Sequence, residues 1–245
     1  MGIKKGQITI FITLGIVLFI IFVIVFLVRA DLIGKLIREQ RIDPNLKDIN
    51  ARVTSCMETI GNSGLELIGL QGGKVTLRPD TYLSIENLQI SYLGMHSTNL
   101  VPQINQIENE LSLFMKDNLI KCAEEFKFQP YEVKYSNIIP KTEIKDDKVI
   151  FEVNWPIVLT KNEKNYKISN FRYETPEKNT ENKKMIRLGH IVNIAREIVD
   201  NLCVTRDKVK EFDVNIDYTN YEDDILYIIE DNDYHFAFAI NKCLQ

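Results

Sequence analysis

Residues 7 to 28 read QITIFITLGIVLFIIFVIVFLV, and no charged side chain interrupts them. A helix of this length, rising about 1.5 Å per residue, would be about 33 Å long and could cross a hydrocarbon core of about 30 Å. Apolar side chains would cover it on every side, so no face is left for water. The run therefore predicts a single membrane-spanning helix, around which we interpret the rest of the chain.

The sequence after this run divides into a short helical extension and a folded domain. Residues 29 to 42, RADLIGKLIREQRI, keep helical spacing of apolar side chains, and Asp43 with Pro44 then suits the N-cap and first position of a new helix. The overall composition, 45% hydrophobic and 26% charged, is ordinary for a globular protein. We expect a basic leader at 1–6, a transmembrane helix at 7–28, a juxtamembrane helix at 29–43 and a soluble α+β domain at 44–245 that is helical in 44–130 and sheet-rich in 131–245.

Apolar side chains at steps of three and four predict three helices in the soluble domain. Gly72 suits the left-handed position that ends the first of them. We expect the helices at 44–71, 102–126 and 181–203.

Elsewhere the pattern changes to the alternation typical of strands. Asp146–Asp147 and Asn162–Glu163 should be turns, Trp155 a core residue, and Pro156 a residue at a sheet edge or a bulge. The fold class is α+β, with an N-terminal transmembrane helix followed by helices packed on an antiparallel β-sheet. The expected strands are 74–77, 87–94, 131–136, 141–145, 149–160, 164–174, 211–218, 224–230 and 235–242.

The four cysteines contain no CxxC pair, and no histidine stands at ligand spacing from them, which argues against a zinc site. Cys56 and Cys122 both fall on the apolar stripes of predicted helices, so a disulfide could join them. Cys203 and Cys243 could pin the last strand in the same way. Two packed core thiols would give the same stripes, so both interpretations stand.

No established catalytic or metal motif occurs. Residues 213 to 224, DVNIDYTNYEDD, place oxygen ligands at several positions of a calcium-binding loop. However, Tyr218 stands where such a loop has its turn glycine, and the alternation of a β-strand explains the same residues. The alternative ligand set is Asp213, Asn215, Asp217 and Asp224, whereas the strand would turn Phe212, Val214, Ile216 and Tyr218 inward.

The remaining polar and ionisable residues form no recognisable catalytic or binding motif. The histidines, His96, His190 and His235, are scattered, and no P-loop, G-x-S-x-G or H-E-x-x-H sequence is present. A net charge of −4 argues against general nucleic-acid binding. We expect a protein that is not an enzyme, with no cofactor and no metal site.

Lys4, Lys5 and Gly6 directly before Gln7 and the long apolar run resemble the class III signal peptide of archaeal type IV pilin-like proteins. The resemblance covers this N-terminal segment only and implies cleavage between Gly6 and Gln7, leaving the apolar helix as an anchor or filament spine. Phe11 stands where many pilins carry a glutamate that aligns subunits. An uncleaved signal anchor is the alternative. The stretch from Cys56 through GLQGG (69–73) to Cys122 is also loosely similar to uncharacterised single-span archaeal proteins, which implies no activity.

The orientation of the domain has evidence on both sides. Basic residues follow the span at Arg29, Lys35, Arg38 and Arg41, which by the positive-inside rule favours a cytoplasmic domain. The pilin-like start and the even number of cysteines favour an extracytoplasmic one. We prefer a single-pass, pilin-like cell-surface protein with a structural or adhesive role, whose partners are the lipid bilayer and either other copies of itself or envelope proteins. The alternatives are a membrane-tethered cytosolic binding module and a tethered enzyme.

Overall fold

The computed structural model describes residues 44–96, 98–124, 131–177, 185–201 and 212–241. The chain divides into two compact units, Met1–Asp48 and Ile49–Gln245. The described residues form three helices and two sheets, which confirms the α+β class. No helix among the described residues is long and apolar enough to span a membrane. The predicted leader, the span at 7–28 and the helix at 29–43 all lie outside the described residues.

The helices are α2 (Pro44–Leu70), α3 (Ile104–Glu124) and α4 (Leu188–Asp200). The first ends as predicted: Gly72 has a φ of +63°, and the N–H of Gly73 bonds the Ile68 carbonyl at 2.8 Å, as in a Schellman motif. The prediction that the third begins at 181 is wrong for 185–187, which are not helical. Arg187 is instead the N-cap of α4, and its guanidinium is bound to Asp231 and Asp213.

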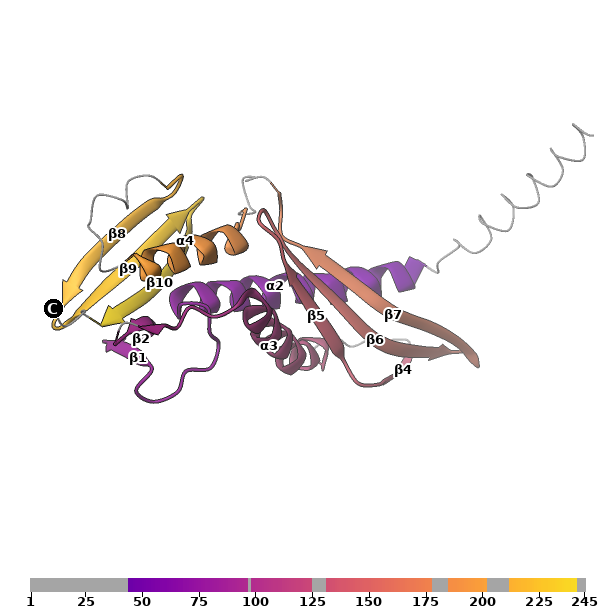
Figure 1. Cartoon of the computed structure of the whole chain (residues 1–245). Coiled ribbons are helices and arrows are strands. Elements are labelled where there is room, and N and C mark those ends of the chain that lie inside the picture. The colour runs from indigo at the N-terminus through magenta and orange to yellow at the C-terminus, as the bar shows by residue number, and fades with distance from the viewer. Residues whose placement is uncertain (1–43, 97, 125–130, 178–184, 202–211, 242–245) are drawn as a thin grey trace, which may run out of the picture. The chain divides into compact units, whose positions relative to one another are not determined.

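One sheet has six strands in the order β1-β2-β10-β9-β8, with β3 also paired to β2 (Figure 1). Its strands are β1 (Tyr82–Ile85), β2 (Leu88–Met95), β3 (Thr98–Asn99), β8 (Asn215–Tyr221), β9 (Asp224–Asp231) and β10 (Tyr234–Asn241). The β2–β10 pair is parallel and the other pairs are antiparallel.

The second sheet has four strands, in which β4 and β5 pair with one edge of β6 and β7 pairs with the other. Its register shifts between Asn154 and Ile157, which confirms a bulge at Pro156. Trp155 is 1% exposed, as expected of a core residue. The strands are β4 (Glu132–Tyr135), β5 (Ile139–Ile144), β6 (Val149–Lys161) and β7 (Lys164–Glu174).

Two sequence predictions about the sheets are wrong. The strands do not form one antiparallel sheet but two sheets, because β2 pairs with the distant β10 rather than with β4 to β7. Residues 74–77 are not a strand; β1 forms instead, at Tyr82–Ile85. Alternation within a strand reports which side chains are buried and carries no information on the partner strand.

Helix α2 contacts residues of both sheets through positions without side chains. A Cβ at Gly61 would lie 3.0 Å from the ring of Phe151 on β6, and a Cβ at Gly69 would lie 3.0 Å from Tyr234 on β10. Gly64 meets Phe114 and Leu111 of α3 in the same way. Glycine therefore permits close packing of α2 against β6, α3 and β10.

Candidate functional site

A disulfide joins α2 to α3. Cys56 and Cys122 are bonded with their Cα atoms 6.1 Å apart, which confirms the predicted Cys56–Cys122 pair. Cys56 is 3% exposed, on the buried stripe of α2 that also contains Val53 and Ile60. The other predicted pair, Cys203–Cys243, lies outside the described residues.

Two tyrosine hydroxyls tie α2 to the sheets. Tyr234 donates to the Leu65 carbonyl at 2.7 Å, and Tyr173 of β7 donates to Asn62 Oδ1 at 3.0 Å. Burial, with a smaller contribution from the nearby Glu58 carboxylate, raises the pKa of Tyr173 to about 12. Burial also raises the pKa of Tyr234 above its ordinary value. Both phenols therefore stay protonated at neutral pH and serve as donors in the structure.

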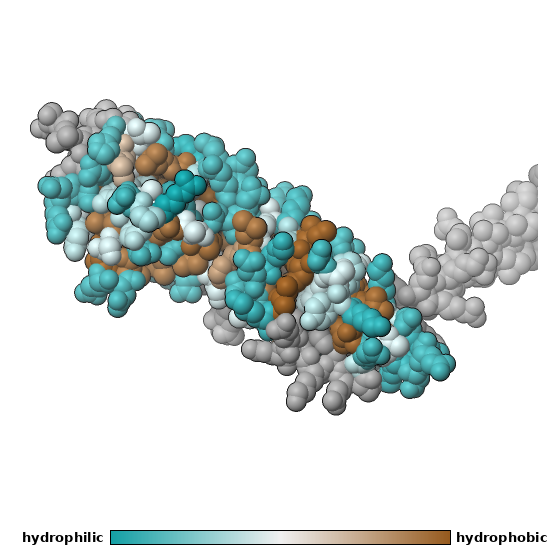
Figure 2. Space-filling model, turned by 90° about the horizontal axis from the view of Figure 1, so that it is seen from below, coloured by the Kyte–Doolittle hydropathy of each residue, from teal (hydrophilic) through white to brown (hydrophobic). Residues whose placement is uncertain are grey.

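Figure 2 shows one face of the molecule on which brown, hydrophobic residues gather in separate patches among teal, hydrophilic ones. Two strongly exposed apolar side chains are Ile139, the first residue of β5, at 64% and Leu113 of α3 at 58%. Ile120, seven residues after Leu113 on α3, is 39% exposed. Single exposed apolar side chains of this kind are common on folded proteins, whereas large contiguous patches suit contacts with other molecules.

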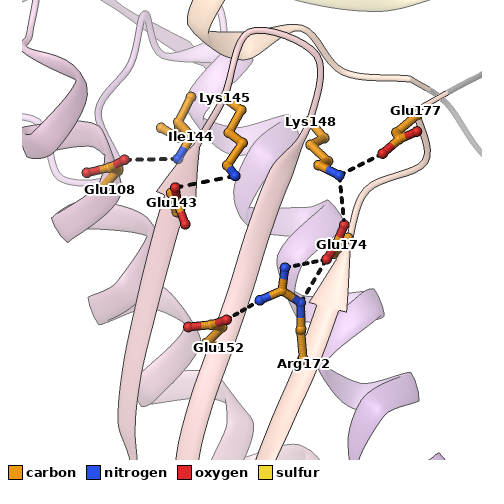
Figure 3. A network of polar contacts seen from close by, with 9 residues as sticks. All are labelled: Glu108, Glu143, Ile144, Lys145, Lys148, Glu152, Arg172, Glu174 and Glu177. Atoms are coloured by element: carbon orange, nitrogen blue, oxygen red, sulfur yellow. Dashed lines mark hydrogen bonds and ion pairs between the residues drawn. The ribbon is translucent and has the colours of Figure 1, made fainter.

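Charged side chains cover part of the second sheet (Figure 3). Arg172 on β7 bonds Glu152 across the strand pair and Glu174 along its own strand, and Lys148 contacts Glu174 at 3.1 Å and Glu177 at 2.6 Å. Hydrogen bonds from Arg172 and then from Lys148 lower the pKa of the Glu174 carboxyl. Most of these groups are well exposed, so we interpret the network as a solvated sheet surface of small energetic weight.

A second polar cluster lies at the start of α4. Arg187 makes two bonds to Asp231, at 2.8 and 3.0 Å, and one to Asp213 at 2.9 Å. His190 Nε2 lies 2.7 Å from the other oxygen of Asp213. The Arg187 bond, followed by the His190 contact, lowers the pKa of Asp213 to about 2. Asp231 is only 5% exposed, so the cluster neutralises a buried carboxylate and attaches α4 to the sheet.

The possible calcium ligands are not brought together as a loop. Asn215 and Asp217 belong to strand β8, while the Asp213 carboxylate is bound by Arg187. Asp224, 8% exposed, accepts bonds from Tyr92 at 2.6 Å and Asn241 at 2.7 Å. The described residues contain no group of three or more His, Cys, Asp or Glu side chains placed to hold a metal ion.

The strand interpretation of this segment is confirmed from Asn215 onward. Its expected burial holds in part, since Phe212, Val214 and Ile216 are half-buried whereas Tyr218 is 42% exposed. The histidines contribute no joint site: His96 is exposed after β2, and His235 lies 3.7 Å from Glu230, away from His190 on α4.

Among the strands of the described residues, β8 is the last in the order of the six-stranded sheet, and it carries the outer member of an aromatic row. Tyr218 on β8 is directly opposite Tyr227 on β9, which is directly opposite Phe238 on β10. Their ring centroids are 5.9 Å and 5.3 Å apart, and the second pair is stacked at 10°. Phe238 is fully buried and Tyr227 is 7% exposed, so the row leads from the core to the edge of the sheet.

Comparison with known proteins gives no relative: no family model, no curated protein and no solved structure matches the chain.

We did not predict the aromatic row from the sequence, although the two-residue turns on either side of β9 indicate it. The strands on either side of Glu222–Asp223 and of Asn232–Asp233 pair through two-residue turns, with Tyr221 opposite Asp224 and Asp231 opposite Tyr234. Because a two-residue turn fixes the register of a hairpin, counting outward from each turn aligns the three aromatic residues.

Proposed function

We propose that this protein is a membrane-anchored, pilin-like cell-surface protein with a structural or adhesive role and no catalytic activity. The uncharged run at 7–28 would be its anchor, and the domain beginning at Pro44 would lie outside the cytoplasm. Its partners would be the lipid bilayer and either other copies of itself or envelope proteins.

The Cys56–Cys122 disulfide carries this proposal. Structural disulfides persist in oxidising compartments and are rare in the cytosol. The bond therefore supports an extracytoplasmic domain, against the basic residues from Arg29 to Arg41 that favour the opposite orientation.

The polar clusters support a role without catalysis. In the described part of the chain, the groups with the largest pKa changes are bound to structural partners: Arg187 to Asp231, Tyr234 to the α2 backbone, and Tyr92 to Asp224. Burial, together with the Asp224 hydrogen bond, raises the pKa of Tyr92. Each of these groups therefore contributes to holding α2, α4 or β2 in place.

N-terminal sequencing of the protein extracted from its native membrane tests the pilin-like part of the proposal. We expect the mature chain to begin at Gln7 and to remain in the membrane fraction after a high-salt wash. A chain that retains Met1 would exclude processing between Gly6 and Gln7. A chain released by the salt wash would exclude the anchor itself.

A further inference from the structure

The six-stranded sheet has a second apolar face, on the side opposite α2. Tyr234 of β10 bonds α2, and because side chains alternate along a strand, Ala237 and Ala239 face the other way. Residues 225–229 of β9 read ILYII, the continuous apolar run of a strand that is covered on both faces. On the second face a buried cluster is bordered by half-buried apolar side chains, and the two sets are Leu83, Ile90, Ala237 and Ala239, and Ile85, Tyr92, Leu226 and Ile228.

Acidic side chains flank this apolar face, and the sequence of the sheet offers no cation to balance them. Residues 82–95 and 215–241 contain carboxylates but no lysine or arginine. Asp217 of β8 is directly opposite Ile228, and Glu230 stands two residues after Ile228, so both carboxylates lie on the same face as the cluster. The face is therefore complementary to a partner that is apolar along one stripe and basic beside it.

Residues 29–42, RADLIGKLIREQRI, have this chemistry and lie outside the described residues. Their apolar side chains recur at the spacing of one helix face, and basic residues outnumber acidic ones. As a helix the segment would be about 21 Å long. The apolar, basic and acidic sets are Leu32, Ile33, Leu36 and Ile37, then Arg29, Lys35, Arg38 and Arg41, then Asp31 and Glu39.

The length of α2 prevents the segment from reaching the sheet of its own copy as a helix. The segment joins the start of α2 through Asp43, whereas the sheet contacts α2 near its other end, at Leu65 and Gly69. The 27 residues of α2 extend about 40 Å, roughly twice the length of the segment. A helical segment that occupies the face must therefore come from a second copy.

We propose that the outer apolar face of the six-stranded sheet binds residues 29–42 of a second copy of this chain. The apolar stripe of the segment packs on Leu226 and Ile228, and its basic side chains lie beside Asp217 and Glu230. The segment and the face are different surfaces and each copy carries both, so association can continue beyond two copies. This inference rests on the proposed surface role and names its partner, and its test does not depend on processing of residues 1–6.

Charge reversal on each side tests the contact, using sedimentation velocity of the full-length chain in detergent over a concentration series. Arg38→Glu/Arg41→Glu makes the segment acidic, and Asp217→Lys/Glu230→Lys makes the face basic. We expect wild type to associate, and each variant alone to need at least about tenfold higher concentration, because like charges then meet. An equal mixture of the two variants should associate as wild type does, since each segment again meets a face of opposite charge.

Glu132→Lys/Glu143→Lys is the matched control, because it makes the same change in net charge at exposed positions of the other sheet. This variant should associate as wild type does. A wild-type chain that stays monomeric, or a mixture of the two reversed variants that does not recover association, would overturn the proposal. Weaker association in the segment variant but not in the face variant would also overturn it, because the segment would then bind elsewhere, as on a lipid surface.

A second pair of variants tests the apolar part of the contact without changing charge. Ile228→Thr and Val158→Thr each replace a half-buried, β-branched strand residue by threonine, the first on the proposed face and the second on the other sheet. Thermal unfolding of both variants shows that the chain remains folded. We expect Ile228→Thr alone to weaken association of the full-length chain, and equal association of the two folded variants would contradict the proposed face.

Discussion

Gly69 marks a close approach between α2 and β10. A Cβ there would crowd the carbonyl oxygen of His235 and lie 3.0 Å from the Tyr234 ring and hydroxyl. We expect Gly69→Ala to lower the free energy of unfolding by about 2 kcal/mol, because overpacking outweighs the gain of about 1 kcal/mol in helix propensity. Urea unfolding of the two proteins measures the difference.

Ser63→Ala is the matched control for this change, since Ser63 is exposed on the same helix. It should leave stability within about 0.5 kcal/mol of wild type. A Gly69→Ala protein as stable as the Ser63→Ala protein would show that α2 and β10 do not approach this closely.

Arg187 controls the titration of Asp213. The folded-state pKa of Asp213, about 2, is below the ordinary value of about 3.9, so its contribution to stability is present above pH of about 4 and is lost as pH falls toward 2. We expect Arg187→Gln to raise this pKa toward the ordinary value and to remove that part of the acid dependence of stability. NMR titration of the Asp213 carboxyl carbon measures the pKa.

Arg196→Gln provides the comparison, because Arg196 lies on the same helix and bonds Asn193 and Pro102 instead of Asp213. The pKa of Asp213 should be unchanged in this variant. An equal change in both variants would mean that general charge, rather than the Arg187 bond, sets the titration.

Single residues differ in how far the sequence predicts their environment. Gly72 and Pro156 were predictable because their backbone chemistry restricts them to a helix end and to a bulge or edge. Gly61 and Gly69 were not, because their role depends on Phe151 and Tyr234, which approach α2 only in the folded chain.

At the scale of elements, the disulfide links α2 and α3 across 66 residues of sequence. Without the disulfide, the unfolded chain regains the conformational entropy of a loop of that length. The free energy of unfolding should therefore fall by about 4 kcal/mol. We expect Cys56→Ala/Cys122→Ala to show this loss in chemical denaturation. Reducing agent should lower the stability of wild type to that of the double variant and leave the variant unchanged, and sensitivity of both proteins would point to other cysteines.

The local sequence pattern predicts most helices and strands, but it does not predict which strands pair with each other. The periodicity of apolar residues and the turn residues predicted α2, α3 and the strands of both hairpin regions. This was possible because the spacing of apolar residues within each segment shows which of its faces is buried. The parallel pairing of β2 with β10 joins segments more than a hundred residues apart, and Arg187, the N-cap of α4, bonds Asp213 and Asp231 from later segments of the chain. Neither the strand pairing nor the contacts of Arg187 can be predicted from the sequence of one segment alone.

At the scale of the whole molecule, the described residues join α2 to α3 through a disulfide and carry an aromatic row from the buried Phe238 to Tyr218 on β8. The sequence predicted the Cys56–Cys122 bond as one of two interpretations of the same helical stripes, and the structure decides between them. It did not predict the order of the described strands in the six-stranded sheet, because the position of a strand in its sheet depends on the whole topology.

Cleavage by protease added to intact cells tests most directly whether the domain lies outside the cytoplasm. We predict that the protease releases fragments of 44–245 and that unreduced digests contain peptides linked through Cys56 and Cys122. The matched control is the same treatment after cell lysis, which should add no further fragments. Full protection in intact cells, with cleavage only after lysis and free thiols at Cys56 and Cys122, would contradict the account.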